Sequence, residues 1–269
     1  MKIIGFADYY INEWHANHYP EWIKEASEEL GTEYAVKYVW AEKEIAPVSK
    51  VSTEEWCRTY GMQKCDSLAE LCKKCDHVIL LAPSNPEKHL EYAGEILKYG
   101  KRTYIDKTFA ANYEEAKEIF RIAKSYGTEF FTTSALRYAE ELFDVEGAKQ
   151  LLITGGGGNL EEYIIHQLEM AVKLMGQNAM SVHVDKQGHQ AVCRIGFEGG
   201  KTASLIYSPS LPFTVCAEKN DGQFVYRELT SDYFRKLMKE ILLFFETGVK
   251  PFAEEQTLAV MKIRDRILS

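Results

Sequence analysis

Near the middle of its first half, the chain contains the segment Asp76-His77-Val78-Ile79-Leu80-Leu81-Ala82-Pro83. Its central residues form a continuous apolar run, which is typical of a strand buried on both faces of a parallel sheet. Further strand-like segments precede and follow it, with helix-like segments between them, at residues 2–6, 34–41, 102–105 and 129–132. Strands that alternate with helices predict a doubly wound parallel sheet over residues 1–134.

Local signals mark the ends of the helices between these strands. Two pairs have the spacing of capping boxes, in which a serine side chain accepts a hydrogen bond from the first helical turn: Ser52 with Glu55, and Ser67 with Glu70. Nearer the amino terminus, Pro20 is expected in the first turn of a helix that ends at Gly31.

The second half of the chain has a different pattern, which predicts an α+β domain over residues 135–269. An amphipathic helix is expected from Leu160 to Met175, and the glycine run at 155–158 is interpreted as a mobile connector before it. Five strand-like segments follow, at 181–185, 190–197, 202–207, 213–218 and 224–229, and two helices close the chain, at 231–247 and 253–268. Turn residues between the strands favour a mostly antiparallel sheet.

Composition excludes several classes of protein. The chain has 269 residues, 46% hydrophobic and 27% charged, which is ordinary for a globular protein. Its net charge of -8 without a basic block argues against a surface that coats nucleic acid. No apolar run approaches the roughly 20 residues that cross a bilayer, so no membrane partner is expected. The start is too soon polar for a signal peptide, and a cytoplasmic location is expected.

Four of the six cysteines lie close together in the sequence, at Cys57, Cys65, Cys72 and Cys75. Four thiolates are sufficient for a structural zinc site, but such sites usually pair two short Cys-x-x-Cys units and only one is present. Buried, reduced thiols are the main expectation, and no metal is predicted.

One helical stripe of ionisable side chains stands out. Within the helix at 160–175, Glu162, His166 and Glu169 recur at spacings of four and three residues, beside the apolar stripe. Three interpretations remain open: a solvated face, a histidine poised by acids as a base in a cleft, and a weaker one in which these side chains bind a metal.

A second candidate is Lys107, which follows the predicted strand at 102–105. Open α/β sheets bind their ligands beyond the carboxyl ends of their strands, and Lys107 lies at such an end. Charged residues are also common at strand ends without any function, so position alone leaves both interpretations open.

Four motifs together resemble the Gfo/Idh/MocA family of NAD(P)-dependent oxidoreductases, typified by glucose–fructose oxidoreductase and inositol dehydrogenase. They are Cys75–Pro83 with Asn85 and His89, Gly100–Lys101 through Asp106-Lys107-Thr108, Gly158–Glu169 ending in Gly176, and Phe244-x-x-Thr247-Gly248-x-x-Pro251. Their order and spacing carry the resemblance over nearly the whole chain. It implies a Rossmann-type domain at 1–134 followed by the α+β domain.

The resemblance also implies roles for the candidate residues. Lys107 would hydrogen-bond the substrate oxygen, His166 would accept the hydroxyl proton, and Glu162 would orient or tune His166. Glu169 matches a more peripheral acid of the family. The substrate would be a sugar, polyol or related hydroxylated small molecule, and the two domains would meet so that Lys107 and His166 face one crevice beside a nicotinamide ring.

For the cofactor, the resemblance implies contacts from Gly5, Phe6, Ala7, Glu42, Ala82, Pro83, Asn85, His89 and Asp106. The family's G-x-G-x-x-G loop is degenerate here, because Ala7 replaces its second glycine and Asp8 and Tyr10 are unfavourable for a phosphate. Glu42 ends the second strand, where an acid accepts hydrogen bonds from a ribose and disfavours a 2′-phosphate. NAD is therefore expected rather than NADP.

The segment after this loop is rich in rings, with Trp14, His15 and His18 close together. Local packing, a platform for a sugar or the nicotinamide, and a metal pair formed by the two histidines are the alternatives.

Three functions follow from the sequence. The leading one is an NAD-linked oxidoreductase, and the main rival is a non-catalytic metabolite-binding or regulatory protein that kept the fold but lost dinucleotide binding. The third is a metal-dependent isomerase or hydrolase that uses His166 with Glu162 or Glu169. By resemblance, a homo-oligomer through the second domain's sheet is also expected.

Overall fold

The computed structural model describes residues 1–269, which divide into two compact units. The first contains Met1–Thr132 and Arg235–Pro251, and the second contains Thr133–Phe234 and Phe252–Ser269. None of the helices is both long and apolar enough to cross a membrane.

The first unit is built on a six-stranded parallel sheet with the order β3-β2-β1-β4-β5-β6. Its strands are β1 (Lys2–Asp8), β2 (Tyr34–Ala41), β3 (Gln63–Lys64), β4 (His77–Leu80), β5 (Thr103–Ile105) and β6 (Phe130–Thr132). Every neighbouring pair is parallel, which confirms the predicted doubly wound sheet. The strand order reverses between β1 and β4, and ligands of open α/β sheets bind beyond the carboxyl ends at this point.

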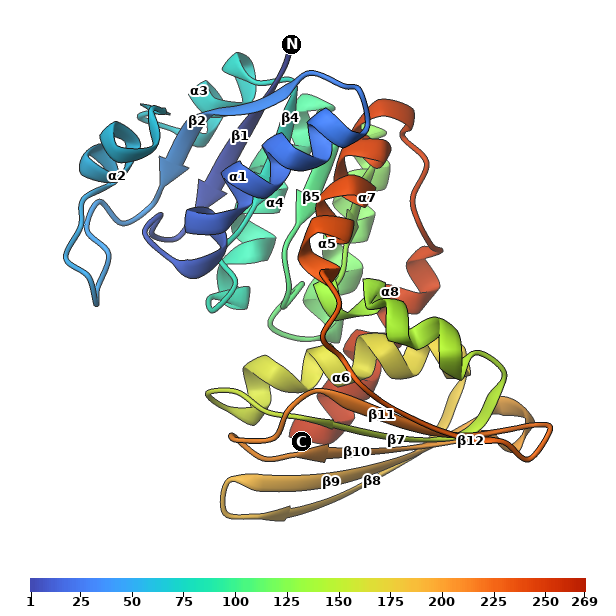
Figure 1. Cartoon of the computed structure of the whole chain (residues 1–269). Coiled ribbons are helices and arrows are strands. Elements are labelled where there is room, and N and C mark those ends of the chain that lie inside the picture. Colours follow the sequence, from blue (N-terminus) through green and yellow to red (C-terminus); the bar gives the residue numbers. More distant parts are fainter. The chain divides into compact units, whose positions relative to one another are not determined.

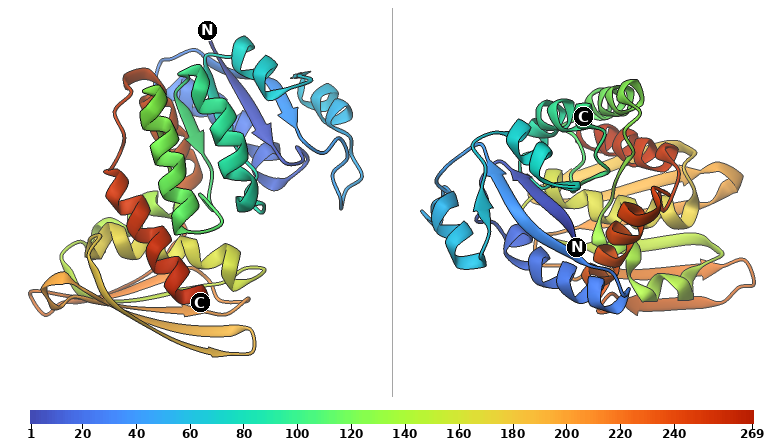
Figure 2. Two further views of the ribbon diagram at one scale, coloured as in Figure 1. Left: turned by 180° about the vertical axis from the view of Figure 1, so that it is seen from behind. Right: turned by 90° about the horizontal axis from the view of Figure 1, so that it is seen from above.

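Helices cover both faces of this sheet (Figure 1). They are α1 (Trp14–Glu29), α2 (Thr53–Tyr60), α3 (Leu68–Lys74), α4 (His89–Ile96), α5 (Tyr113–Tyr126) and α7 (Tyr233–Thr247). Helices α4 and α5 lie side by side on one face (Figure 2), whereas α1 and α7 cover the other. The serine caps are as predicted: Ser52 accepts a bond from the backbone N–H of Glu55, and Ser67 from that of Glu70.

The division of the chain differs from the predicted boundary, because α7 belongs to the first unit although it lies far along the sequence. The ring of Phe245 stacks on His77 at 4.4 Å between centroids, and Phe244 packs against Phe131 at 5.0 Å. An amphipathic helix near the end of a chain carries no local signal of which sheet it covers, so the sequence assigned it to 135–269.

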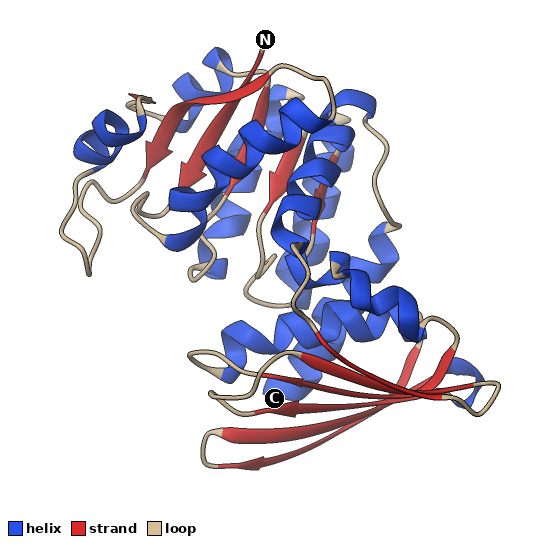
Figure 3. Cartoon of the chain, viewed as in Figure 1, coloured by secondary structure: helices blue, strands red, loops and turns tan.

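The second unit contains a mixed six-stranded sheet with the order β12-β11-β7-β10-β9-β8. Its strands are β7 (Ala148–Gly155), β8 (Ala179–Gln187), β9 (Gln190–Phe197), β10 (Thr202–Tyr207), β11 (Thr214–Lys219) and β12 (Phe224–Glu228). Only the β7–β10 pair is parallel, so the expectation of a mostly antiparallel sheet is confirmed. Helices α6 (Leu160–Met175) and α8 (Glu254–Leu268) cover one face of the sheet (Figure 3). Short 3₁₀ helices complete the two units: η1 (Pro86–Lys88), η2 (Leu97–Tyr99), η3 (Ala135–Tyr138), η4 (Glu140–Val145) and η5 (Glu198–Gly200).

Strand β7 and the glycine run after it were not interpreted correctly from the sequence. Gly155 is the last residue of β7, and Gly156 and Gly157 are closely packed rather than forming an open connector. A Cβ on Gly157 would collide with the ring of Tyr163, and Gly157 has a φ of 146°. Only glycine fits this close approach between the end of β7 and the first turn of α6.

The cysteines form no metal cluster. All six are free thiols, five of them buried and Cys216 half-buried. Burial raises the pKa of the Cys57 and Cys65 thiols to about 11, which keeps them protonated at neutral pH. No group of three or more His, Cys, Asp or Glu side chains is arranged to hold a metal ion.

Candidate functional site

The residues expected to form the dinucleotide loop lie inside strand β1. Gly5, Phe6 and Ala7 belong to the strand, and Phe6 and Ala7 are fully buried. A Cβ on Gly5 would lie 2.9 Å from the side chain of Leu71, so this glycine allows α3 to pack closely against β1. The residue that ends the strand at the ligand-binding edge is therefore Asp8.

Asp8 bridges the carboxyl ends of β1 and β4. Its Oδ1 atom accepts hydrogen bonds from the backbone N–H of Tyr9 at 2.7 Å and of Ala82 at 3.0 Å, while its buried Oδ2 atom has no partner. Burial, followed by the charge of Glu13, raises the pKa of Asp8 well above its ordinary value. Ala82 has a φ of 54°, which is uncommon for a residue other than glycine. The carboxyl group of Asp8 thus occupies the edge of the sheet at which the strand order reverses.

Glu13 caps helix α1. It has an extended backbone, and its carboxylate accepts the backbone N–H groups of His15, at 2.8 Å, and of Ala16. The helix begins at Trp14, so Pro20 lies inside it and not in the first turn as predicted. Glutamate is not among the usual capping residues, which explains why the sequence signal was missed. Burial raises the pKa of Glu13, with the nearby Asp106 adding to that effect.

A buried hydrogen-bonded cluster joins the start of α1 to the end of β5. The ring of His15 is bonded through Nδ1 to Asp106, and Tyr19 stacks on that ring at 5.1 Å between centroids. Asp106 also accepts from the hydroxyl of Tyr104 at 3.2 Å. Burial opposes ionisation of Asp106, but the charge and hydrogen bond of His15 outweigh it and lower the pKa of Asp106.

Lys107 lies where the sequence placed it, directly beyond the carboxyl end of β5. Its side chain is nearly buried, with 7% of the residue exposed, and its backbone N–H donates to Oδ1 of Asp106 at 2.9 Å. The carboxylate of Asp106 therefore binds both the backbone of Lys107 and the ring of His15.

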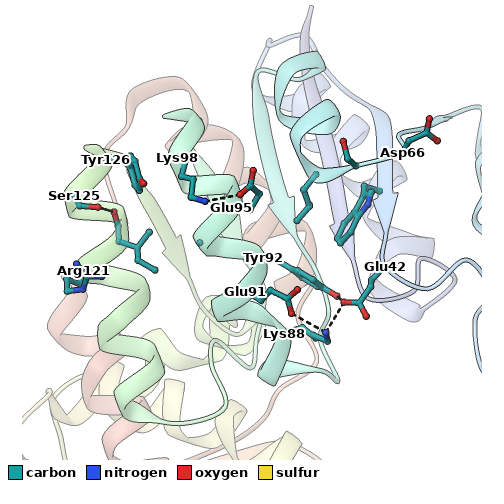
Figure 4. Close-up of a pocket in the computed structure, with 15 residues that line it drawn as sticks. Glu42, Asp66, Lys88, Glu91, Tyr92, Glu95, Lys98, Arg121, Ser125 and Tyr126 are labelled. Carbon is teal, nitrogen blue, oxygen red and sulfur yellow. Dashed lines mark hydrogen bonds and ion pairs between the residues drawn. The ribbon is translucent and has the colours of Figure 1, made fainter.

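Glu42 lies beyond β2, at the same edge of the sheet (Figure 4). Its carboxylate accepts the hydroxyl of Tyr92 at 2.6 Å and pairs with the Lys88 ammonium at 2.8 Å and with that of Lys43 at 3.3 Å. Hydrogen bonds from Lys88 and Tyr92 lower the pKa of Glu42 to about 2. The predicted ribose-binding acid is thus ionised at neutral pH and fixed in position.

A charged groove of about 1010 Å³ begins at Glu42 and runs along α4 to α5 (Figure 4). Lys88, Lys98 and Arg121 line it, and each of them is paired with a glutamate. Asp8, Glu13 and Lys107 do not line this groove, so it is separate from the cluster at the switch point.

Three other predicted cofactor residues, Pro83, Asn85 and His89, lie between the end of β4 and the first residue of α4. Pro83 is buried, and the Asn85 amide donates to Glu87 at 3.0 Å. The fully buried ring of His89 lies 2.6 Å from the carbonyl oxygen of Leu81 and 3.0 Å from that of Phe109. His89 thus connects the loops that follow β4 and β5.

The rings at the start of α1 form a ladder along the helix. The centroids of Trp14 and His18 are 4.4 Å apart, and those of His18 and Trp22 are 5.3 Å apart. His18 is bonded to the carbonyl oxygen of Trp14, whereas His15 is bonded to Asp106. Because the two histidines have different partners, the structure favours packing over a metal pair.

In the second unit, the residue hydrogen-bonded to His166 is Ser134. The serine Oγ lies 2.6 Å from Nδ1 of the histidine and also accepts the backbone N–H of Leu136 at 3.2 Å. The rings of Tyr163 and Phe213 lie close by, with centroids 5.7 and 5.5 Å from that of His166. The imidazole is half-buried and oriented, as a group that exchanges protons requires.

A buried ion pair holds the segment that carries Ser134. Arg137 donates to the carboxylate of Glu169 at 3.0 Å, and the Thr133 hydroxyl donates to the same oxygen at 3.1 Å. The Lys173 ammonium donates to the carbonyl oxygen of Arg137 at 2.7 Å. Burial raises the pKa of Glu169 although Arg137 opposes this. Glu169 therefore anchors the chain after β6 to helix α6.

Glu162 lies one turn before His166 in the first turn of α6. Its backbone N–H donates to the Asn159 side chain at 2.8 Å, and the Asn159 amide lies 3.5 Å from its carboxylate. Asn159 and Glu162 thus form the start of the helix. The proposed tuning of His166 by Glu162 stays a prediction.

Ser134, Arg137 and Glu13 were missed from the sequence. Ser134 and Arg137 follow the short strand β6, and polar residues after a buried strand are the signal that was available for both. Lys107 belongs to the first unit and His166 to the second, and their predicted meeting at one crevice stays a prediction.

Comparison with known proteins identifies a family that the first part of the chain resembles. The family model described as an oxidoreductase family with an NAD-binding Rossmann fold, GFO_IDH_MocA, matches residues 5–134. No curated protein sequence matches the chain significantly.

Solved structures resemble the chain over almost its whole length. A probable dehydrogenase from Thermotoga maritima has a TM-score of 0.80 and 14% identity, covering 99% of this chain and 96% of that one. A putative myo-inositol dehydrogenase from Sinorhizobium meliloti has a TM-score of 0.75 and 13% identity, with coverage of 100% and 96%. GenD2 from gentamicin A biosynthesis, in complex with NAD, has a TM-score of 0.78 and 12% identity, with coverage of 100% and 94%. At these identities the likeness shows the fold.

Proposed function

Because the model of an oxidoreductase family with an NAD-binding Rossmann fold, GFO_IDH_MocA, matches residues 5–134, we propose that this chain oxidises or reduces a CH–OH group of a small hydroxylated molecule such as a sugar or polyol. The proposed reacting side chains are Lys107 and His166. Lys107 would donate a hydrogen bond to the substrate oxygen, and His166 would take the hydroxyl proton or return it.

The observation that supports this proposal best is the Ser134–His166 hydrogen bond of 2.6 Å. When Nδ1 donates to the serine Oγ, the lone pair of Nε2 is left to accept a proton, which is the form a general base needs. The nearly buried position of Lys107 beyond β5 supports the second role, because a cation there stabilises charge that develops on an oxygen.

We propose NAD rather than NADP as the coenzyme, on the evidence of Glu42. Its carboxylate is ionised and held by Tyr92 and Lys88, so it is placed to accept ribose hydroxyls and to repel a 2′-phosphate. The adenosine end of a dinucleotide therefore fits the residues present.

The diphosphate end does not fit the residues as they stand. The backbone N–H groups of His15 and Ala16, at the start of α1, already donate to Glu13, and Asp8 closes the neighbouring edge of the sheet. Diphosphates bind at such a helix start through N–H groups that have no other partner. The roles proposed for Lys107 and His166 therefore concern their contacts with the substrate and not contacts with the dinucleotide.

Turnover with a panel of sugars and polyols tests the proposal, with formation of NADH as the readout. We expect activity in the wild type, and a loss of about 10²–10⁴-fold in kcat for His166→Ala, as is usual when a general base is removed. A matched control is His18→Ala, whose ring is bonded to a backbone carbonyl on α1. Absence of both turnover and binding at millimolar NAD(H) and NADP(H) would count against the proposal.

A second candidate function is favoured by Glu13. A protein of this fold whose diphosphate donors are occupied is suited to bind a metabolite without a dinucleotide. Sugar binding in a protein that ignores nicotinamide nucleotides, even after Glu13 is replaced, would support this alternative.

The location and assembly of the protein are also proposals. We propose a cytoplasmic location, which free thiols support.

We propose that copies pair through the sheet of the second unit, where Leu152, Phe224 and Tyr226 are exposed. Light scattering of the purified protein should give a dimer or larger assembly, and Leu152→Asp should shift it toward the monomer; a monomeric wild type would contradict this.

A further inference from the structure

We infer that the Glu13 carboxylate occupies the place of the coenzyme diphosphate, so that this carboxylate must leave before a dinucleotide binds. The inference rests on the proposed function, since it takes the carboxyl edge of the first sheet as the NAD site.

The hydrogen-bond donors at the start of α1 are the first reason. The first N–H groups of any α-helix have no acceptor within the helix, and they bind anions because the helix dipole adds positive potential there. In α1 the N–H groups of His15 and Ala16 both donate to Glu13. A phosphate oxygen needs these same two donors, so the two anions compete for one place.

The charge around this place is the second reason. Asp8, Glu13 and Asp106 bring three carboxyl groups together, and they influence one another's ionisation. One imidazole, that of His15, is bonded to this group through Asp106. A diphosphate would add about two negative charges to a buried acidic cluster, where the low effective dielectric constant strengthens repulsion. Removing one carboxyl group therefore relieves both competition and repulsion.

The packing of the loop that holds Glu13 is the third reason. Ile11, two residues before Glu13, is only 2% exposed, and Glu13 donates its backbone N–H to the carbonyl oxygen of Ile11 at 2.9 Å. The His15–Asp106 bond ties the first turn of α1 to the end of β5. Glu13 is thus held at the helix start by the fold, so displacing its carboxylate costs binding energy.

Titration calorimetry of the full-length protein with NAD⁺ tests the inference. Glu13→Ala removes the carboxylate and frees both N–H groups, and it should bind NAD⁺ at least tenfold more tightly than the wild type. Glu13→Gln keeps the shape and one acceptor without the charge, so its affinity should fall between the two. Glu21→Ala is the matched control, because it removes the same charge from an exposed position on the same helix.

A double variant tests the contribution of the neighbouring carboxyl group, that of Asp8. Asp8→Asn with Glu13→Ala removes both charges, while the new amide oxygen at position 8 can still accept from the N–H of Ala82. This variant should bind at least as tightly as Glu13→Ala. ADP-ribose, which has the diphosphate without the nicotinamide, should show the same order of affinities.

The outcomes separate this inference from the proposed function. A gain in Glu13→Ala but not in Glu21→Ala supports it. Equal affinity of wild type and Glu13→Ala overturns it while leaving an NAD-dependent activity possible. No binding by any variant, with circular dichroism showing that each is folded, also overturns it. Turnover by the wild type is measured independently and decides the proposed function.

Discussion

The Oγ atom of Ser134 lies 2.6 Å from Nδ1 of His166, and this bond joins the chain after β6 to helix α6. The serine hydroxyl is itself held by the N–H of Leu136, and the segment around it is held by Arg137 and Glu169. The imidazole therefore has a fixed ring orientation before any substrate arrives, which lowers the cost of reaching a reactive geometry.

Ser134→Ala should lower kcat by about tenfold while leaving KM nearly unchanged, because the ring loses the partner that sets its orientation and tautomer. Steady-state kinetics with the best substrate of the panel measures both constants. Thr133→Val is the matched control, since it removes a neighbouring hydroxyl that donates to Glu169 instead of His166. A change in KM alone, or equal losses in both variants, would show that Ser134 does not position the base.

Arg137→Met should lower the free energy of unfolding by about 3–5 kcal/mol, because it leaves the buried Glu169 carboxylate without its cation. Urea denaturation at neutral pH measures this. The double variant Arg137→Met with Glu169→Leu should recover part of the loss, since no buried charge remains unpaired. A single variant as stable as the wild type would contradict the assigned role of the pair.

Glu42→Gln should lower the free energy of unfolding by at most about 1 kcal/mol at neutral pH, because solvent weakens this partly exposed pair. The folded pKa of about 2 lies below the ordinary value of 4.5, so the contribution is present above pH 4.5 and is lost as pH falls toward 2. Denaturation curves over that range should show the difference between wild type and variant disappearing. A difference that grows as pH falls would contradict the assignment.

Gly157→Ala should destabilise the second unit by more than about 2 kcal/mol, on the order of an overpacked core, because the added Cβ meets the ring of Tyr163. Thermal unfolding measures the effect. Gly188→Ala is the control: that glycine also has a positive φ, of 59°, but a Cβ there meets nothing within 4 Å. Its cost should be about 1 kcal/mol, from backbone strain alone. Equal losses would show that the contact with Tyr163 does not matter.

Periodicity and capping were sufficient for most of the fold. The run at Val78–Ala82 and the serine caps at 52 and 67 depend on neighbouring residues only, so the sequence shows them directly. Helix α7 was assigned to the other unit because its contact with His77 joins residues far apart in the sequence. Long-range packing of this kind has no local signature.

The candidate site was predicted less completely for a related reason. Lys107 was predicted from its position after a strand, and His166 from its spacing along a helix. Ser134 was identified only from the structure, in which the start of η3 packs against α6. The segment at 5–10 was recognised as unfavourable for phosphate, but the cap formed by Glu13 was not, since glutamate is a rare capping residue.

Crystal structures of the wild type and of Glu13→Ala, each grown with NAD⁺, show directly which group the start of α1 holds. At an NAD⁺ concentration that fills the variant but not the wild type, we expect the wild type to keep the Glu13 carboxylate on the N–H groups of His15 and Ala16, and the variant to hold a diphosphate there. A wild-type crystal with the diphosphate on those N–H groups while Glu13 stays in place would contradict this expectation.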